Sequence, residues 1–506
     1  MSLKKNVVAN FLGQGWAALI SLAFIPLYIK YLGIEAYGLI GIFSLLQAWL
    51  MLLDVGMTPA LSREMARFSG GAHNAQSIRN LLRSVEVIGF SLAILVSLCI
   101  WGLSGWLATN WLKVEKIPID DVAHAFVIMG IVVGLRFVEN IYRSCIIGLQ
   151  KQVTLNVVSS ATATLRSVGA VGVLIWIAPT INAFFIWQGI VSVITATVFI
   201  IILYNDLPVS EQRGQFSWSA ITNIWRFAAG IAAITFLSFL LMQTDKILLS
   251  RFLTLEQFGY YSLAALVANS LNMMVGPIDL AFFPRFTTQA SHDNQSALIS
   301  TFHIGAQLIT VFVGAAAITL IMFGDIVLSL WTQDASLAKN IAPLLAILSL
   351  GTLFNCFMHM PYQLQLAHGW TSLTIKVNII AVVLLVPAIF WVAPKYGAEG
   401  VAWVWVILNV SYVIFAAHFM FYRLLKTEKL SWYIQDITIP LISAVFVAGI
   451  LRWSLPNNMS QIKWLFALLL CSILTFLAAA LAAPLLKKQM RSYILKMTKL
   501  YLVRKN

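Results

Sequence analysis

Long apolar stretches alternate with short polar connections along the whole chain. Runs of about twenty mostly apolar residues match the length that an α-helix needs to cross the hydrocarbon core of a bilayer. The pattern therefore predicts an all-α polytopic membrane protein with about fourteen transmembrane helices. The predicted spans cover residues 7–30, 37–58, 84–110, 121–148, 153–178, 182–204, 221–250, 258–284, 297–323, 338–367, 372–393, 399–422, 435–454 and 463–485.

Composition excludes a water-soluble fold. The 506 residues are 60% hydrophobic and only 10% charged, with a mean hydropathy of +0.87, whereas soluble domains are about a quarter charged. Each of the four cysteines, Cys99, Cys145, Cys356 and Cys471, lies inside an apolar run without a CxxC spacing or a neighbouring histidine cluster. Neither a disulfide framework nor a metal site is therefore predicted.

The net charge of +14 follows the membrane topology and does not indicate nucleic-acid binding. With the N-terminus in the cytoplasm, about 22 of the 33 Lys and Arg residues fall on the cytoplasmic side and about nine on the opposite side. By the positive-inside rule, both termini are expected in the cytoplasm. The membrane that the chain spans is expected to be the inner membrane of the cell. The basic tail, 486–506, is expected to form an amphipathic helix on anionic membrane lipids, or else to fray in water.

The connection between the first two spans recurs six spans later. Tyr31-Leu-Gly-Ile-Glu-Ala-Tyr-Gly-Leu39 matches Phe252-Leu-Thr-Leu-Glu-Gln-Phe-Gly-Tyr260 at a constant offset of 221 residues. An even number of spans between the copies gives them the same orientation. This predicts two pseudo-symmetric six-helix lobes, 1–204 and 221–422, followed by two accessory helices in 435–485. The alternative is that an aromatic-x-Gly turn joins helices in many unrelated proteins.

Several segments resemble a known family. The segments that carry the resemblance are Asn10, Gln14, the repeated connection, the Leu-Asp-Val-Gly-Met-Thr-Pro-Ala-Leu-Ser-Arg-Glu stretch at 53–64 and Gln243-Thr-Asp-Lys246. Through them the chain resembles the polysaccharide-transporter branch of the multidrug/oligosaccharidyl-lipid/polysaccharide (MOP) exporter superfamily, most of all its O-antigen flippases. The resemblance implies a V-shaped pair of helix bundles, alternating access and an undecaprenyl-diphosphate-linked oligosaccharide as cargo. It also implies a polysaccharide polymerase and a chain-length regulator as partners.

Two arginines lie in the middle of predicted spans. Arg136 and Arg166 are each 15 residues from Lys151, the turn between their spans, so both lie about 20 Å above that turn. Because an arginine exposed to lipid at this depth is costly, both are expected to face a cavity or a partner. Two guanidiniums at one depth predict a diphosphate-binding site, with Arg143 as a third contributor.

The alternative to an anion site is pairing within one helix. Arg136 is three residues from Glu139, and Glu139 is four residues from Arg143, so the three side chains are spaced to neutralise one another. Arg166 has no acidic residue in its own span and would still need a partner elsewhere. Glu139 is also a candidate for gating or ion coupling.

Acidic residues further along the chain are candidates for coupling to protons or sodium ions. Asp245 lies beside Lys246 in the outer part of span 221–250, and Asp279 follows Gly276-Pro277. The Gly-Pro pair is expected to break its helix and free backbone groups. A carboxylate in a low-dielectric site exchanges a proton more readily near neutral pH. The alternative is that these residues cap helices or form salt bridges.

Transport is the function class that these features favour. The chain has no phosphate-binding loop, HExxH helix or GxSxG elbow, which argues against an ATP-driven pump, an enzyme or a bound cofactor. A glycan polymerase or ligase is an alternative, but it needs a large external loop. A multidrug or cation antiporter of the same superfamily is expected to carry acidic residues and no paired arginines. The sequence therefore predicts a flippase for a lipid-linked oligosaccharide.

Overall fold

The computed structural model describes residues 3–488 except 70, 72, 209–212, 292–294 and 457–458. Within these ranges the secondary structure is helical, apart from one isolated bridge between Lys113 and Thr254. The chain divides into two compact units, Met1–Gly259 and Tyr260–Asn506. The predicted all-α class is confirmed. Most of the basic tail predicted for 486–506 lies outside the described residues.

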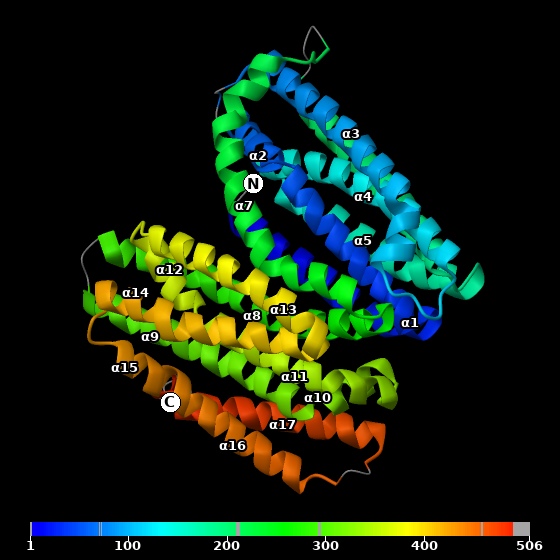
Figure 1. Cartoon of the computed structure of the whole chain (residues 1–506). Helices are drawn as coiled ribbons and strands as arrows, with labels where there is room; N and C mark the ends of the chain where they lie inside the picture. The colour runs from blue at the N-terminus through cyan, green and yellow to red at the C-terminus, as the bar shows by residue number, and fades with distance from the viewer. Residues whose placement is uncertain are drawn as a thin grey trace, which may run out of the picture. The chain divides into compact units, whose positions relative to one another are not determined.

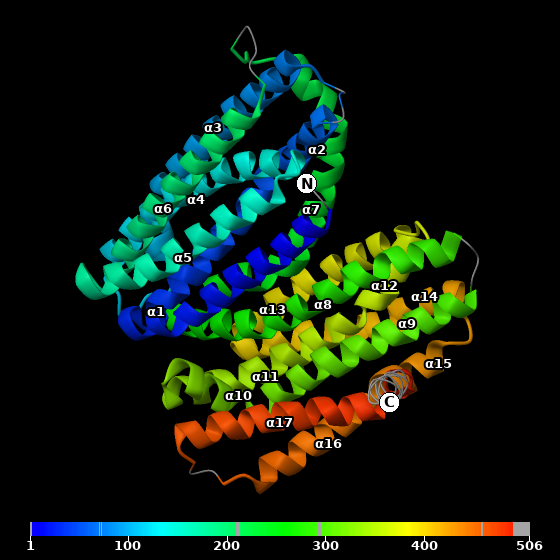
Figure 2. The same cartoon turned by 180° about the vertical axis from the view of Figure 1, so that it is seen from behind.

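The first unit is built around α4, which is buried along most of its length. This helix packs against α2, α3 and α6, while α5 lies along α1 and α7 contacts α1, α2 and α3 (Figures 1 and 2). The helices of this unit are α1 (Leu3–Leu53), α2 (Met57–Ser69), α3 (Ala75–Trp106), α4 (Ile119–Gly148), α5 (Gln152–Trp176), α6 (Ile181–Asp206) and α7 (Trp218–Phe252).

The second unit begins within α8 and ends with a pair of helices, α16 and α17, which lie side by side (Figure 2). In its core α10 packs against α11 and α17, and α11 packs against α13. The helices are α8 (Leu255–Ser291), α9 (Gln295–Ile309), α10 (Ala315–Thr332), α11 (Ala335–Phe357), α12 (His359–Ala367), α13 (Ser372–Ser411), α14 (Ala417–Leu424), α15 (Lys429–Ser431), α16 (Ile439–Ser454) and α17 (Gln461–Ala482).

Eleven helices in the described ranges are long and apolar enough to cross a membrane. Two of them contain two predicted spans each: Leu12–Leu50 turns at Gly33, with φ 83°, and Ser372–Leu424 turns at Gly397, with φ 58°. Glycine suits both turns because a β-carbon disfavours positive φ. The predicted span 221–250 lies in α7, which is not among these eleven helices. Each of the fourteen predicted spans therefore overlaps a helix, although 37–58 runs past the end of α1 into the corner before α2, and 338–367 spans both α11 and α12.

The two copies of the repeated connection contact each other inside the first unit. A β-carbon on Gly38 would lie 2.5 Å from the carbonyl oxygen of Leu255, and one on Gly259 would lie 2.4 Å from that of Ile34. The offset of 221 residues relates Ile34 to Leu255 and Gly38 to Gly259, so the contact is reciprocal. This pseudo-twofold arrangement favours a true repeat over a chance recurrence of a common turn.

Of two expectations about the helices after residue 204, one is wrong and the other stays a prediction. The predicted break at Gly276-Pro277 is wrong, because α8 runs as one helix from Leu255 to Ser291 with Pro277 inside it. Proline removes a single backbone donor, which a long helix in a membrane tolerates. By its contacts α7 groups with the first unit. The lobe boundaries at 204 and 221, which rest on the repeat, stay a prediction.

Candidate functional site: an arginine-lined cavity

The arginines singled out by their depth line one cavity in the first unit. This cavity has a volume of about 390 Å³ and lies among α1, α2, α4, α5 and α7. We call it the arginine cavity. Its charged and amide-bearing lining residues are Gln47, Asp54, Arg136, Glu139, Asn140, Arg143 and Arg166.

Arg136 is held by neutral groups. Its Nη1 donates a hydrogen bond of 2.6 Å to Oε1 of Gln47, and its Nη2 donates one of 3.0 Å to Oε1 of Gln188. The guanidinium also lies 5.1 Å from the centre of the Phe43 ring. Amide oxygens and an aromatic face orient a guanidinium without neutralising it. The positive charge of Arg136 is therefore available to an anion in the cavity.

Arg166 is paired across two helices. Its Nη2 lies 3.1 Å from Oε2 of Glu139 on α4 and 3.3 Å from Oγ of Ser192 on α6. The predicted alternative, in which Glu139 pairs with Arg136 and Arg143, is therefore wrong. Arg166 obtains the partner that its own span lacks. Its Nε is buried and has no hydrogen-bond partner among the described residues.

The charge balance of the arginine cavity is positive. Three guanidiniums line it against two carboxylates, those of Glu139 and Asp54. Asp54 accepts hydrogen bonds from the backbone N–H of Thr58 and, at 2.6 Å, from its hydroxyl, so this carboxylate caps the start of α2. Arg143 is exposed and forms no ion pair with any described residue. An anion entering the cavity would meet forked donors from α4 and α5.

The other predicted site residues lie elsewhere. Asp245 and Lys246 are half-buried on α7, where Lys246 donates a hydrogen bond of 3.3 Å to Gln243. Asp279 on α8 lies 2.7 Å from Nδ1 of His359 on α12. None of Asp245, Lys246 and Asp279 lines the arginine cavity. Asp279 and His359 thus form a side-chain pair between α8 and α12 of the second unit.

A buried polar cluster in the second unit was not predicted as a site. His303 lies 2.5 Å from Oδ2 of Asp436 and 3.1 Å from Glu428, while Gln307 donates a hydrogen bond of 2.8 Å to Asp436. The Oε1 of Gln307 also accepts from the backbone N–H of Leu485, at 3.0 Å. The cluster thus joins α9 to the segments that flank α16 and α17. Asp436 was detectable as a carboxylate inside the predicted span 435–454.

Comparisons with known proteins agree with this architecture. A family model described as "Polysaccharide biosynthesis protein" matches residues 3–290. A relative from Shigella flexneri, described as "Putative O-antigen transporter", is 22% identical over 415 residues, which cover 80% of this chain and 94% of that protein.

Solved structures show the same fold at low sequence identity. The lipid II flippase MurJ, in an inward closed conformation, aligns with a TM-score of 0.71 at 14% identity, covering 94% of this chain and 98% of that one. An inward-facing multidrug resistance MATE family transporter of the MOP superfamily aligns with a TM-score of 0.66 at 14% identity, covering 82% of this chain and 96% of that one. The fold is therefore one that membrane transporters use.

Proposed function

The chain belongs to the polysaccharide biosynthesis protein family, and on that premise we propose that it flips an undecaprenyl-diphosphate-linked oligosaccharide across the membrane. The cargo is an O-antigen repeat unit or a similar precursor of a surface polysaccharide. It moves from the cytoplasmic to the periplasmic leaflet of the inner membrane by alternating access. The chain itself is not an enzyme, and both of its termini lie in the cytoplasm.

The arginine cavity is the observation that carries this proposal. A diphosphate presents several oxygens in a compact group, and arginine donates paired hydrogen bonds to such oxygens. Arg136 is oriented by Gln47 and Gln188 without being neutralised, and Arg166 stands beside it with an unpartnered Nε. The names of the Shigella flexneri relative and of the MurJ structure support a lipid-linked cargo.

The other function classes fit the cavity less well. A cationic drug would be repelled by three guanidiniums facing two carboxylates. A glycan polymerase or ligase needs a substantial outer loop for its chemistry, whereas the connections 112–118 and 177–180 are short. A flippase requires only binding, release and a change of access, which suits helices joined by short turns.

Coupling to protons or sodium ions is part of the proposal. Asp279, a carboxylate inside α8 that lies 2.7 Å from Nδ1 of His359, is one candidate for this coupling. Glu139 can respond to substrate, because an anion that binds Arg166 competes with its carboxylate. Asp245 and Lys246 remain candidates on α7. The flipped product would then serve a polysaccharide polymerase and its chain-length regulator.

A complementation experiment tests the proposal. In a strain that lacks this chain, we expect loss of surface polysaccharide and accumulation of its lipid-linked precursor. The wild-type chain should restore the polysaccharide, and Arg136→Gln should not, at equal amounts of protein in the membrane. Arg213→Gln, which removes an exposed arginine outside the cavity lining, in the connection between α6 and α7, is the matched control. Full restoration by both Arg136→Gln and Arg166→Gln would overturn the proposal.

A further inference from the structure

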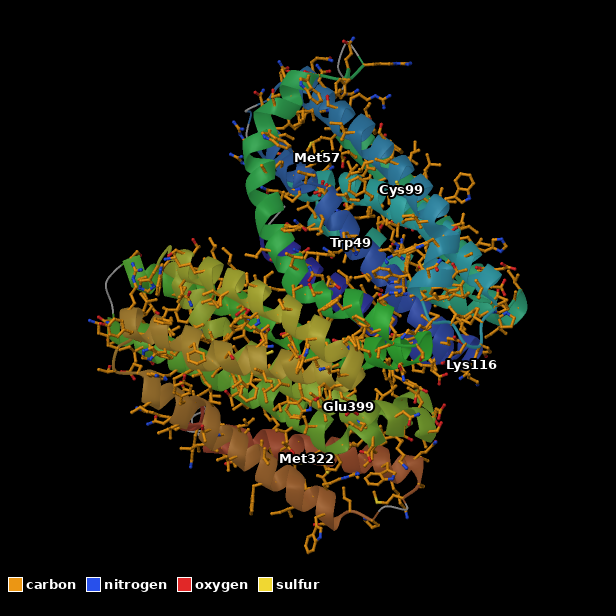
Figure 3. The ribbon with its side chains drawn as sticks, in the orientation of Figure 1. Trp49, Met57, Cys99, Lys116, Met322 and Glu399 are labelled. Atoms are coloured by element: carbon orange, nitrogen blue, oxygen red, sulfur yellow. The ribbon has the colours of Figure 1, made fainter. Side chains whose placement is uncertain are left out.

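A larger, apolar cavity lies in the same unit as the arginine cavity. It has a volume of about 930 Å³, opens to the surface, and is lined by residues of α3 between Val87 and Leu95, by Phe216 and the first turns of α7, and by the corner between α1 and α2. Apart from Ser91 and Thr222, its lining is entirely aliphatic or aromatic. Figure 3 shows Met57, one of these residues, where α2 begins between α3 and α7. We call it the apolar cavity.

One corner of the chain separates the two cavities. Asp54 caps α2 through Thr58, while Val55 and Gly56 adopt positive φ values of 47° and 73°. These constraints give the corner a single shape, in which successive side chains face opposite ways. Asp54, Gly56 and Thr58 line the arginine cavity, whereas Leu53, Val55 and Met57 line the apolar cavity.

We propose that the apolar cavity binds the isoprenoid chain of the substrate while the arginine cavity binds its diphosphate. This inference rests on the function proposed above, since it assigns the two chemical halves of one molecule to the two sides of the corner at 53–58. An anionic group joined directly to a hydrocarbon chain needs a charged site and an apolar site in contact. The two cavities lie on either side of the corner at 53–58, whose alternate residues line one or the other, so the two sites are neighbours along the chain.

The depth and size of the apolar cavity agree with this occupant. Residues 87–95 lie near the cytoplasmic end of the predicted span 84–110, which is the leaflet where the substrate starts. A volume of about 930 Å³ lies in the range of small-molecule sites, about 300–1,000 Å³. The apolar cavity therefore holds the isoprene units next to the diphosphate, and the rest of the isoprenoid stays in the lipid.

Filling the apolar cavity tests the inference. Ser91 is exposed and lines the cavity, so Ser91→Trp narrows it without disturbing the packed core. Leu98→Trp, on the same helix at a position that is 54% exposed and outside the lining, is the control. We expect Ser91→Trp to weaken binding of undecaprenyl diphosphate to the purified full chain about tenfold, since excluding two methylene groups suffices. Leu98→Trp should bind it like the wild type, and inorganic diphosphate should bind all three proteins equally.

A photoreactive prenyl diphosphate shows directly where the isoprenoid chain of the substrate binds. We expect its label on residues 87–95 and 216–228, with undecaprenyl diphosphate displacing it far better than phosphatidylglycerol does. Equal displacement by phosphatidylglycerol, labelling of other segments, or wild-type binding by Ser91→Trp would overturn the inference. Failure of the proposed function looks different: inorganic diphosphate would not bind, or would bind independently of Arg166, and that result would overturn both.

Discussion

Replacing Arg166 by glutamine removes the positive partner of Glu139. The two side chains are 19% and 15% exposed and 3.1 Å apart, so the variant leaves a largely buried carboxylate without its counter-charge. Breaking a buried pair in this way costs about 3–5 kcal/mol. Because both side chains retain some exposure, we expect a loss at the lower end of this range: the unfolding free energy of Arg166→Gln should fall by about 3 kcal/mol. That corresponds to a folding equilibrium constant reduced by roughly two orders of magnitude.

A double variant separates stability from binding. In Glu139→Gln/Arg166→Gln, two neutral amides replace the pair and no charge is stranded, so the unfolding free energy should return to within about 1 kcal/mol of the wild type. Binding of inorganic diphosphate should remain weak, because the guanidinium is still absent. Arg166→Lys should keep most of the stability but bind diphosphate poorly, since lysine is a point charge without forked donors.

Two measurements decide the outcome. Denaturant unfolding in mixed micelles gives the free energy, and titration calorimetry with inorganic diphosphate gives the affinity, with Arg213→Gln as the control for loss of one arginine. If the double variant bound diphosphate like the wild type, Arg166 would be a structural residue only. If Arg166→Gln were as stable as the wild type, the argument from the stranded carboxylate of Glu139 would be refuted.

Three further perturbations test the corner, α2 and the topology. Gly56→Ala should lower the unfolding free energy by about 1–3 kcal/mol, because alanine is strained at a φ of 73°; an unchanged thermal midpoint would contradict this. Burial raises the pKa of Glu64, but hydrogen bonds from His73 and Arg67 outweigh burial and lower it. Its contribution to stability is therefore complete above its unfolded pKa of about 4.3 and is lost as the pH falls further, so Glu64→Gln should flatten the acid limb of the stability profile. Cysteines placed between α2 and α3, in the connection near residues 69–75, should react only from the cytoplasmic side, and labelling in intact cells would refute the topology.

The positions of the helices were predictable from the sequence because membrane insertion is a one-dimensional constraint. A span needs about twenty apolar residues, whatever surrounds it. Each predicted span accordingly overlaps a helix, and the two turns inside long helices fall at Gly33 and Gly397. The shared cavity of Arg136 and Arg166 was also predictable, since the fixed rise of a helix converts equal distances from Lys151 into equal depth.

The rotation of each helix about its axis could not be predicted in the same way. It depends on side chains of other helices, which no local spacing encodes. Glu139 is correctly spaced to pair with arginines of its own helix, α4. It pairs instead with Arg166, because α5 is rotated so that the Arg166 side chain faces Glu139. Gly276-Pro277 carries a local signal for a break, yet the helix continues through it. The corner at 53–58 has a local cause in the cap of Asp54, but the charged and the apolar cavity on its two sides form only where α3, α4 and α7 pack around it.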